Sequence, residues 1–169
     1  MDEMYERSYL IQEAVAKYSK TVARTAFSYL KNVSDAEDVT QEVFLALLQS
    51  TMKFEDEEHL KAWLIRVTIN KCKNYLKSGW FKHRNELPKD LAYMPNEESE
   101  LLQAVLSLRK KYRVPIHLYY YEGYALKEIA EILDEPVATI GTRLARGRNQ
   151  LKKLIGGNEY EQECIQISR

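Results

Sequence analysis

Apolar side chains recur at helical spacing along almost every long segment of this chain, and the alternating pattern that favours strands is nearly absent. Because this period matches the α-helix, we expect an all-α fold. A first helix is predicted from about Tyr5 to Leu30. A second is predicted to start at Ser34, in a capping-box pattern that ends at Glu37, and a third covers residues 58–78. The inward positions expected on the first two helices are Val15, Tyr18, Val22, Ala26, Tyr29, Val39, Val43, Ala46 and Leu47.

The helical period fades between Trp80 and Glu98, where prolines lie among polar residues. We therefore predict two small helical domains joined by a flexible linker. Their expected ranges are 1–80 and 99–157, with the linker at 81–98 and a polar tail at 158–169. In the second domain we expect Pro115 in the first turn of a helix, and we expect helices to end at Gly123 and at Gly156. The apolar face of its first helix is expected to contain Leu101, Leu102, Val105 and Leu108.

Charge is unevenly distributed, although 25 Lys and Arg balance 25 Asp and Glu. The charged residues of 35–58 are mostly acidic, whereas those of 61–89 and 137–154 are mostly basic. On a neutral protein this segregation favours more than one macromolecular partner, because a polyanion and a basic protein surface are attracted to opposite patches. Solvated helix faces would explain any single run of charge. The prediction of several partners therefore depends on finding two basic runs and one acidic run in the same chain.

The segment AWLIRVTINKCKNYLKS, residues 62–78, has two different faces at helical spacing. We expect Trp63, Leu64, Val67 and Leu76 on the apolar side. Cations and amides follow one another along another side, which we call the donor ridge: Arg66, Asn70, Lys73, Asn74 and Lys77. Amides can hydrogen-bond base edges and lysines can bind phosphates, so the donor ridge suits a nucleic-acid strand.

The segment from Ala125 to Ile155 has the pattern of a helix-turn-helix. A short helix with Leu126, Ile129, Ala130 and Leu133 inward is followed by a turn at residues 134–136 and a second helix with Val137, Ile140 and Leu144 inward. Small residues and arginines on the outer side would let the second helix enter a major groove. The alternative is an ordinary helical hairpin with a basic outer face. The expected outward positions are Ala138, Thr139, Gly141, Thr142, Ala145 and Arg146, with Arg143 at the edge and Arg148 one turn on.

Other classes of protein are disfavoured by the sequence. There is no apolar run of about 20 residues and no secretory signal at the N-terminus, so we expect a cytoplasmic protein without membrane insertion. Cys72 and Cys164 are far apart and are expected to be buried or idle thiols. The three histidines are scattered, no catalytic grouping or glycine-rich phosphate loop is present, and we predict no metal, no cofactor and no enzymatic activity.

Three segments in this order resemble the extracytoplasmic-function sigma factors of bacterial RNA polymerase: DAEDVTQEVFLALLQS, HLKAWLIRVTINKCKNYLKS and ALKEIAEILDEPVATIGTRLARGRNQLKKL. The resemblance implies a polymerase-facing motif at Asp35, Asp38, Gln41, Glu42 and Phe44. It implies contacts with the non-template strand of the melted downstream promoter element at Phe54, Arg66, Asn70, Lys73, Asn74 and Lys77. It implies upstream-element contacts at Ala138, Thr139, Thr142, Arg143, Arg146 and Arg148.

The chain departs from the family pattern at Asp134, where the family usually has glycine, and at Gly141, where many members have a basic residue. We expect a transcription initiation factor that binds core RNA polymerase, recognises two promoter elements, assists strand opening and is held by an anti-sigma factor. The alternative is a free-standing helix-turn-helix regulator that binds DNA as a dimer, which would need a self-complementary apolar surface. A nuclease is disfavoured because it needs clustered acids for metal.

Overall fold

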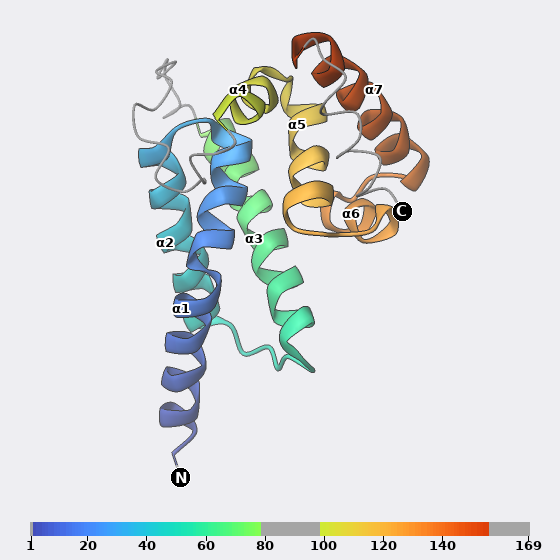
Figure 1. The fold of residues 1–169 in the computed structure, drawn as a ribbon. Helices are drawn as coiled ribbons and strands as arrows, with labels where there is room; N and C mark the ends of the chain where they lie inside the picture. The colour runs from blue at the N-terminus through green and yellow to red at the C-terminus, as the bar shows by residue number, and fades with distance from the viewer. Residues whose placement is uncertain (1, 79–98, 156–169) are drawn as a thin grey trace. The chain divides into compact units, whose positions relative to one another are not determined.

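The computed structural model describes residues 2–78 and 99–155, and these residues form an all-α structure, as predicted (Figure 1). The chain divides into two compact units, residues 1–93 and 94–169. The predicted linker at 81–98 and the tail at 158–169 lie outside the described residues, so these domain boundaries stay predictions. The helices are α1 Glu3–Leu30, α2 Val33–Gln49, α3 Glu57–Lys77, α4 Ser99–Ser107, α5 Lys110–Ile116, the π-helical turn η2 His117–Tyr121, α6 Leu126–Leu133 and α7 Val137–Ile155.

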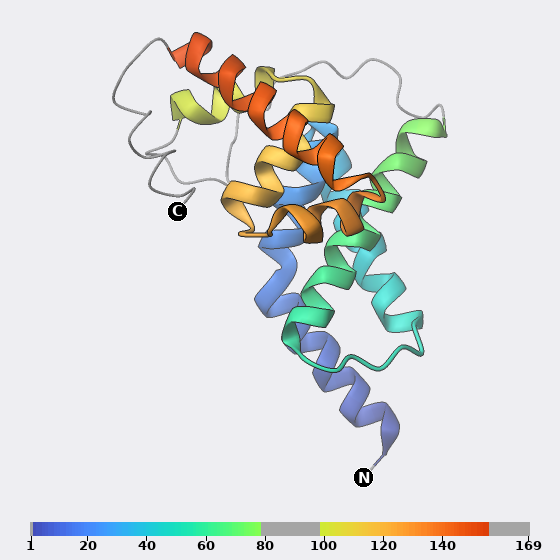
Figure 2. The same cartoon turned by 90° about the vertical axis from the view of Figure 1, so that its right-hand side faces the viewer.

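The N-terminal unit is an up-down-up bundle in which α1 and α3 both pack against α2 and against each other (Figure 1). The N-terminal end of α1 projects beyond the other two helices in both ribbon views (Figures 1 and 2). Burial of each aliphatic side chain in such a core contributes about 1.5 to 3 kcal/mol. The large, fully buried side chains of this unit include Val22, Val39, Leu64, Ile65 and Ile69.

The inward face predicted for α1 is confirmed at Tyr18, Val22, Ala26 and Tyr29, which are buried. Val15 was predicted inward and is 39% exposed, so that prediction is wrong. The buried residue of this turn is Ala14, and successive positions of a helix differ by about 100° in direction. On α2, Val39, Val43 and Leu47 are buried as predicted, and Ala46 is partly exposed.

Helix α2 begins earlier than the predicted capping box at Ser34. Lys31 adopts the left-handed conformation, φ 58°, which ends α1, and Asn32 becomes the N-cap of α2. The Asn32 side chain accepts a hydrogen bond from the backbone N–H of Asp35 at 2.9 Å. Asparagine and serine are both strong N-caps, and Asn32 is the first of them after the turn.

The buried face of α3 differs from the predicted one. Leu64 is buried, but Trp63, Val67 and Leu76 are only partly covered. The helix contacts both α1 and α2, and therefore buries a stripe set between two neighbours rather than a single apolar edge. Thr68 can lie inside this stripe because its hydroxyl donates to the Leu64 carbonyl at 2.7 Å. The buried residues of α3 are Leu60, Leu64, Ile65, Thr68, Ile69 and Cys72.

In the C-terminal unit, Leu102, Val105 and Leu108 are buried as predicted, although Leu108 lies after α4 has ended. Pro115 was predicted in a first turn, but it lies near the end of α5, because the extended backbone of Arg109 starts this helix further upstream. The wider turn η2 follows α5 directly, and Gly123, with φ 73°, comes just after it. The prediction of a helix end at Gly123 is confirmed.

Helices α6 and α7 form the helix-turn-helix (Figure 2). Asp134 adopts the left-handed conformation, φ 53°, which aspartate enters at low cost, and the Glu135 N–H donates to the Ala130 carbonyl at 3.0 Å. Leu126 and Val137 were predicted inward, but both are exposed because they are the first residues of their helices. The buried residues of the pair include Ile129, Ala130, Ile132, Leu133, Ile140 and Leu144.

Candidate functional site

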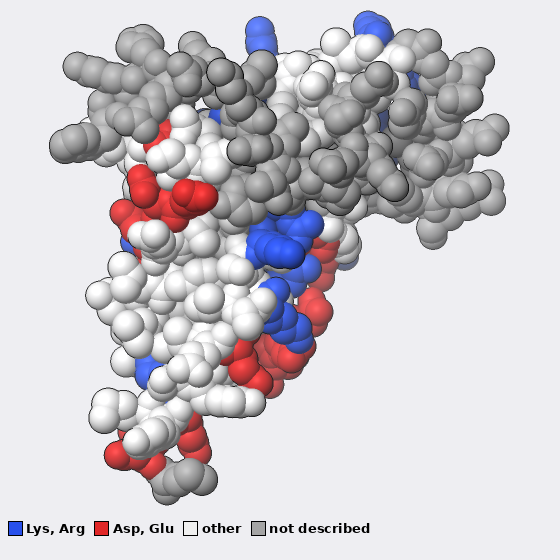
Figure 3. All heavy atoms as spheres, turned by 60° about the vertical axis from the view of Figure 1, so that its left-hand side comes forward, with Lys and Arg blue, Asp and Glu red and all other residues white. Residues whose placement is uncertain are grey.

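The outer face of α2 exposes an acidic and apolar stripe. Asp38, Gln41 and Glu42 are exposed, as predicted, and Leu45 continues the stripe with 54% of its surface exposed. Phe44, on the flank of this face, is half-buried. The Glu42 carboxylate lies 3.9 Å from the ammonium of Lys71 on α3, and both side chains are well exposed, so this pair is weak. On the face shown in Figure 3, acidic side chains lie in separate groups with uncharged surface between them.

Asp35 does not share that surface. It is only 3% exposed, and its Oδ1 accepts a hydrogen bond from the hydroxyl of Tyr75 on α3 at 2.6 Å. The sequence alone predicted it beside Asp38 and Glu42, but its carboxylate faces the bundle. Asp35 thus fixes the start of α2 against the C-terminal part of α3.

The donor ridge of α3 is present as a surface feature. Arg66, Asn70, Asn74 and Lys77 are exposed, and Lys73 is half-buried. Steps of three and four residues place these side chains on one side of the helix. The ridge occupies the C-terminal half of α3, from Arg66 to the last residue, Lys77. The loop that joins α2 to α3 meets the opposite, N-terminal end of the helix (Figure 1).

That loop is organised by an aromatic cluster. Phe54 makes edge-to-face contacts with His59 and Trp63, each with ring centroids 5.5 Å apart. Asp56 caps α3 by accepting from the His59 N–H at 2.7 Å. His59 and Trp63 were not among the predicted site residues, although their spacing of four on α3 beside Phe54 was visible in the sequence.

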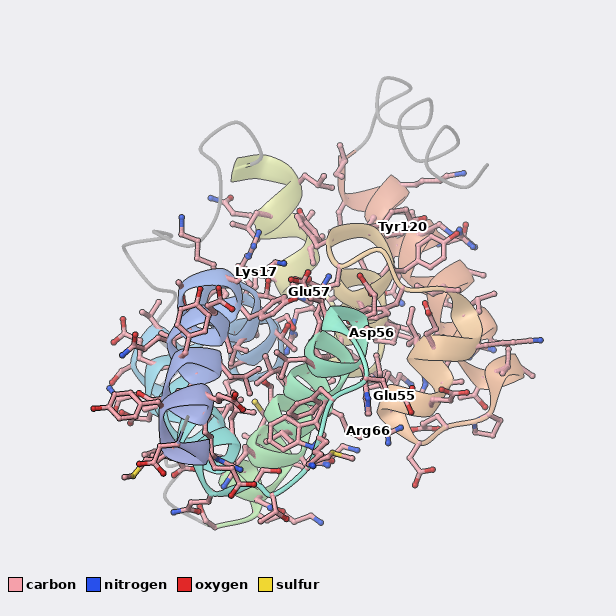
Figure 4. The ribbon with its side chains drawn as sticks, turned by 90° about the horizontal axis from the view of Figure 1, so that it is seen from below. Lys17, Glu55, Asp56, Glu57, Arg66 and Tyr120 are labelled. Atoms are coloured by element: carbon pink, nitrogen blue, oxygen red, sulfur yellow. The ribbon has the colours of Figure 1, made fainter. Side chains whose placement is uncertain are left out.

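The loop is also tied to α1. Lys17 of α1 forms an ion pair with Glu57 at the first position of α3, and Figure 4 shows these two side chains next to the loop residues Glu55 and Asp56. The Nδ1 atom of His59 accepts from the Glu55 N–H at 3.3 Å. Phe54 remains partly exposed, so the loop presents an aromatic side chain in a defined position.

The outer face of α7 is small and basic, as predicted. Ala138, Thr142, Ala145 and Arg146 are exposed, and Thr139 is partly exposed. Burial raises the pKa of Tyr112 on α5, but hydrogen bonding to Lys111 and Arg146 outweighs it and leaves this pKa below its usual value. Arg146 therefore lies where α7 passes α5.

The other two predicted DNA-binding arginines also make contacts within the protein. Arg143 Nη1 lies 3.1 Å from Glu135 Oε1 in the turn before α7. Arg148 Nη1 donates to the hydroxyl of Tyr120 at 3.2 Å. Both arginines are partly exposed. They hold α7 against the turn and against η2, respectively, and each can still present part of its guanidinium outward.

Metal clusters and membrane spans are both absent from the described part of the chain. Residues 2–78 and 99–155 contain no group of three or more His, Cys, Asp or Glu side chains placed to hold a metal ion. None of the described helices is both long and apolar enough to span a membrane.

The three-helix unit and the helix-turn-helix unit each match a region of the sigma-70 class of sigma factors. Sigma-70 region 2 matches residues 14–81, and Sigma-70 region 4 matches residues 98–151. The ECF RNA polymerase sigma factor SigW of Bacillus subtilis is 30% identical over 156 residues, covering 80% of this chain and 83% of SigW. The ECF sigma-E factor of Haemophilus influenzae is 30% identical over 161 residues, covering 83% and 85%. The chain belongs to the ECF sigma factors of RNA polymerase.

Solved structures support the same fold. The sigma factor RpoE in complex with the anti-sigma factor NepR from Bartonella quintana matches with a TM-score of 0.70 at 20% identity, covering 88% of this chain and 98% of that one. CnrH in complex with the cytosolic domain of CnrY matches with a TM-score of 0.65 at 23% identity, covering 88% and 89%.

Proposed function

We propose that this ECF sigma factor binds core RNA polymerase through the outer face of α2 and directs the enzyme to promoters with two recognised elements. The observation that carries the proposal is the exposed stripe of Asp38, Gln41 and Glu42, which extends onto Leu45. Acidic groups around an exposed apolar residue suit a basic protein surface, because charge complementarity steers association and the apolar contact adds affinity. Phe44 supports this face from its flank, and Asp35 acts by positioning α2.

The donor ridge and the preceding loop are the proposed site for the downstream element. Phe54, held by His59 and Trp63, offers a π-face on which an unpaired base can stack. Asn70 and Asn74 can hydrogen-bond base edges, and the remaining residues of the ridge supply positive charge for phosphates. The remaining members of the ridge are Arg66, Lys73 and Lys77. This arrangement fits a single strand, so the same surface would assist strand opening.

Helix α7 is the proposed site for the upstream element in duplex DNA. Arg146, Thr142 and Ala138 are exposed on its outer face, and small side chains there allow close entry into a major groove. Thr139 flanks this face. Arg143 and Arg148 are only partly exposed at the edges of this face, and we assign them phosphate contacts there.

The proposed role is binding and positioning, with the chemistry carried out by the polymerase, so the chain itself is not an enzyme. It would act where polymerase meets the chromosome, in the cytoplasm. An anti-sigma factor is a further proposed partner, because the structures of RpoE and CnrH were solved with NepR and CnrY. The alternative function is that of a dimeric DNA-binding regulator, which would not bind core polymerase.

The test is co-purification with core polymerase. The chain with Asp38→Lys and Glu42→Lys should lose core binding by at least about 100-fold, since reversal of two charges at an interface replaces attraction with repulsion. Its free energy of unfolding should change by only about 0.5 kcal/mol per exposed site. The matched control is Glu6→Lys with Glu13→Lys, which makes the same charge change at exposed positions of α1. The control should bind core polymerase normally.

Normal core binding by the α2 double variant would remove α2 from the interface. A wild-type chain that never co-purifies with polymerase but binds duplex DNA as a dimer would favour the regulator instead.

A further inference from the structure

Two glycines of α7 stand in opposite steric environments. A Cβ atom added at Gly147 would lie 3.1 Å from Cγ1 of Ile116 and 3.5 Å from Cβ of Tyr112. The 3.1 Å contact with Ile116 is tighter than ordinary van der Waals packing, so the absent side chain at Gly147 lets α5 approach α7. A Cβ atom added at Gly141 would meet no atom within 4 Å. Packing within the described residues therefore explains Gly147 and does not explain Gly141.

Backbone conformation does not explain Gly141 either. The glycine with positive φ among the described residues is Gly123, and Gly141 lies in regular helix as the fifth residue of α7. Glycine in a helix interior is less favourable than alanine, because it loses more backbone freedom on folding. The protein thus keeps a destabilising residue at a position where alanine would fit.

The position of Gly141 on α7 indicates why a side chain is absent there. It directly precedes the exposed Thr142 and lies within one turn of the exposed residues Ala138 and Ala145. The backbone of α7 is therefore the surface of the molecule at this point of the face assigned to upstream DNA. Glycine is the usual residue where a backbone must approach a ligand closely.

We propose that Gly141 is a specificity-determining residue for the upstream element, because duplex DNA approaches the backbone of α7 there more closely than any side chain would allow. The proposal rests on the function proposed above and adds to it how closely the backbone of α7 approaches the DNA. Specific docking in a groove depends on close fit, whereas non-specific binding depends mainly on phosphate charge. A side chain at residue 141 should therefore cost specific binding far more than non-specific binding.

The experiment measures stability and DNA binding of the same variants. Gly141→Ala in the full chain should raise the unfolding midpoint of the C-terminal unit by a few degrees, about 2 to 8 °C. In holoenzyme, its affinity for a promoter fragment found by transcript-start mapping should fall roughly tenfold, the size of one mismatched base pair. Affinity for a random-sequence duplex of the same length should change less than about twofold. Gly141→Leu should lose more promoter affinity than Gly141→Ala.

The matched control is Gly147→Ala on the same helix. The short contact with Ile116 predicts a lower unfolding midpoint for this variant, the opposite sign to Gly141→Ala. A more stable Gly141→Ala variant with unchanged promoter affinity would overturn the inference while leaving the proposed function intact. So would a loss of promoter affinity that accompanies a lower unfolding midpoint, because the effect would then be structural. Wild-type holoenzyme without preference for the promoter fragment over the random duplex would overturn the proposed function and this inference together.

Discussion

The hydrogen bond between Tyr75 and Asp35 shows how a single contact fixes part of a functional surface. The Tyr75 hydroxyl donates to a carboxylate that is 3% exposed and that lies 40 residues earlier in the chain. A buried carboxylate needs such donors, because burial without them costs far more than the hydrogen bond itself contributes. The bond joins α3 to the first turn of α2, one turn before the proposed polymerase-binding residue Asp38.

We predict that Tyr75→Phe destabilises the N-terminal unit by about 1 to 3 kcal/mol, because Asp35 stays buried and loses a donor. Urea denaturation followed by circular dichroism measures this change. The control is Tyr5→Phe, which removes the same hydroxyl from a residue that is 73% exposed and should have an effect within about 0.5 kcal/mol. If the two variants unfold at the same urea concentration, the Tyr75 hydroxyl does not support the fold.

Residue contacts also explain what the sequence could not predict. Asp35 carries the same charge as Asp38 and Glu42, and its pairing with a tyrosine of another helix becomes visible only when the bundle is assembled. The same holds for Arg143 and Arg148, whose partners in the turn and in η2 are set by tertiary packing. Sequence patterns predict which side chains can bind a partner, and they do not exclude partners inside the protein.

At the scale of elements, periodicity predicted helices more reliably than helix faces. The helix-turn-helix and the long N-terminal helices follow from apolar spacing and from turn residues such as Asp134. The prediction of the buried face of α3 was wrong because that helix contacts two neighbours. The stripe that faces both of them contains Ile65, Thr68 and Ile69, and leaves Trp63 and Val67 only partly covered. The predicted exposure of the donor ridge was correct because amide and charged side chains are rarely buried, so the core does not draw them inward.

We expect the neutral and the charged residues of the donor ridge to have different roles in DNA binding. Asn70 is neutral, so its contribution is hydrogen bonding to bases, whereas Lys77 acts through phosphates. In holoenzyme, Asn70→Ala should keep core binding and reduce discrimination among downstream-element sequences by about 1 to 3 kcal/mol. Lys77→Ala should weaken binding to all sequences alike and should reduce the slope of log affinity against log salt concentration by about one unit. Permanganate footprinting and gel-shift titration at two salt concentrations measure both effects.

The control for the ridge is Lys71→Ala, a cation of α3 that lies toward Glu42 rather than on the ridge. It should leave downstream-element preference unchanged. Equal promoter opening by Asn70→Ala on matched and mismatched sequences would show that the ridge is only a generic basic surface.

At the scale of the whole molecule, the net charge of zero has a consequence for DNA binding. Basic surfaces on α3 and α7 attract phosphates, but the acidic stripe of α2 on the same chain repels them, so the chain has no strong overall attraction for DNA. Core polymerase, in the proposed function, would cover the acidic stripe and open a strand for the donor ridge. Contacts at both elements then add, as in any bivalent binder whose sites are held at matching positions.

We therefore expect the isolated chain to bind a promoter duplex weakly, with less than about tenfold preference over a random-sequence duplex, and the holoenzyme to prefer the promoter by about 1,000-fold or more. Fluorescence anisotropy on the same labelled fragments, with and without core polymerase, measures both ratios. The double variant Asp38→Lys with Glu42→Lys separates the effect of acidic charge from the effect of core polymerase, because it removes both the acidic charge and core binding. The isolated variant should bind both duplexes more tightly than wild type. It should gain no specificity when core polymerase is added. A dimeric regulator would behave in the opposite way, with full promoter preference in the isolated chain and no response to core polymerase. That result would place recognition in the chain alone and leave the acidic stripe of α2 without its proposed partner.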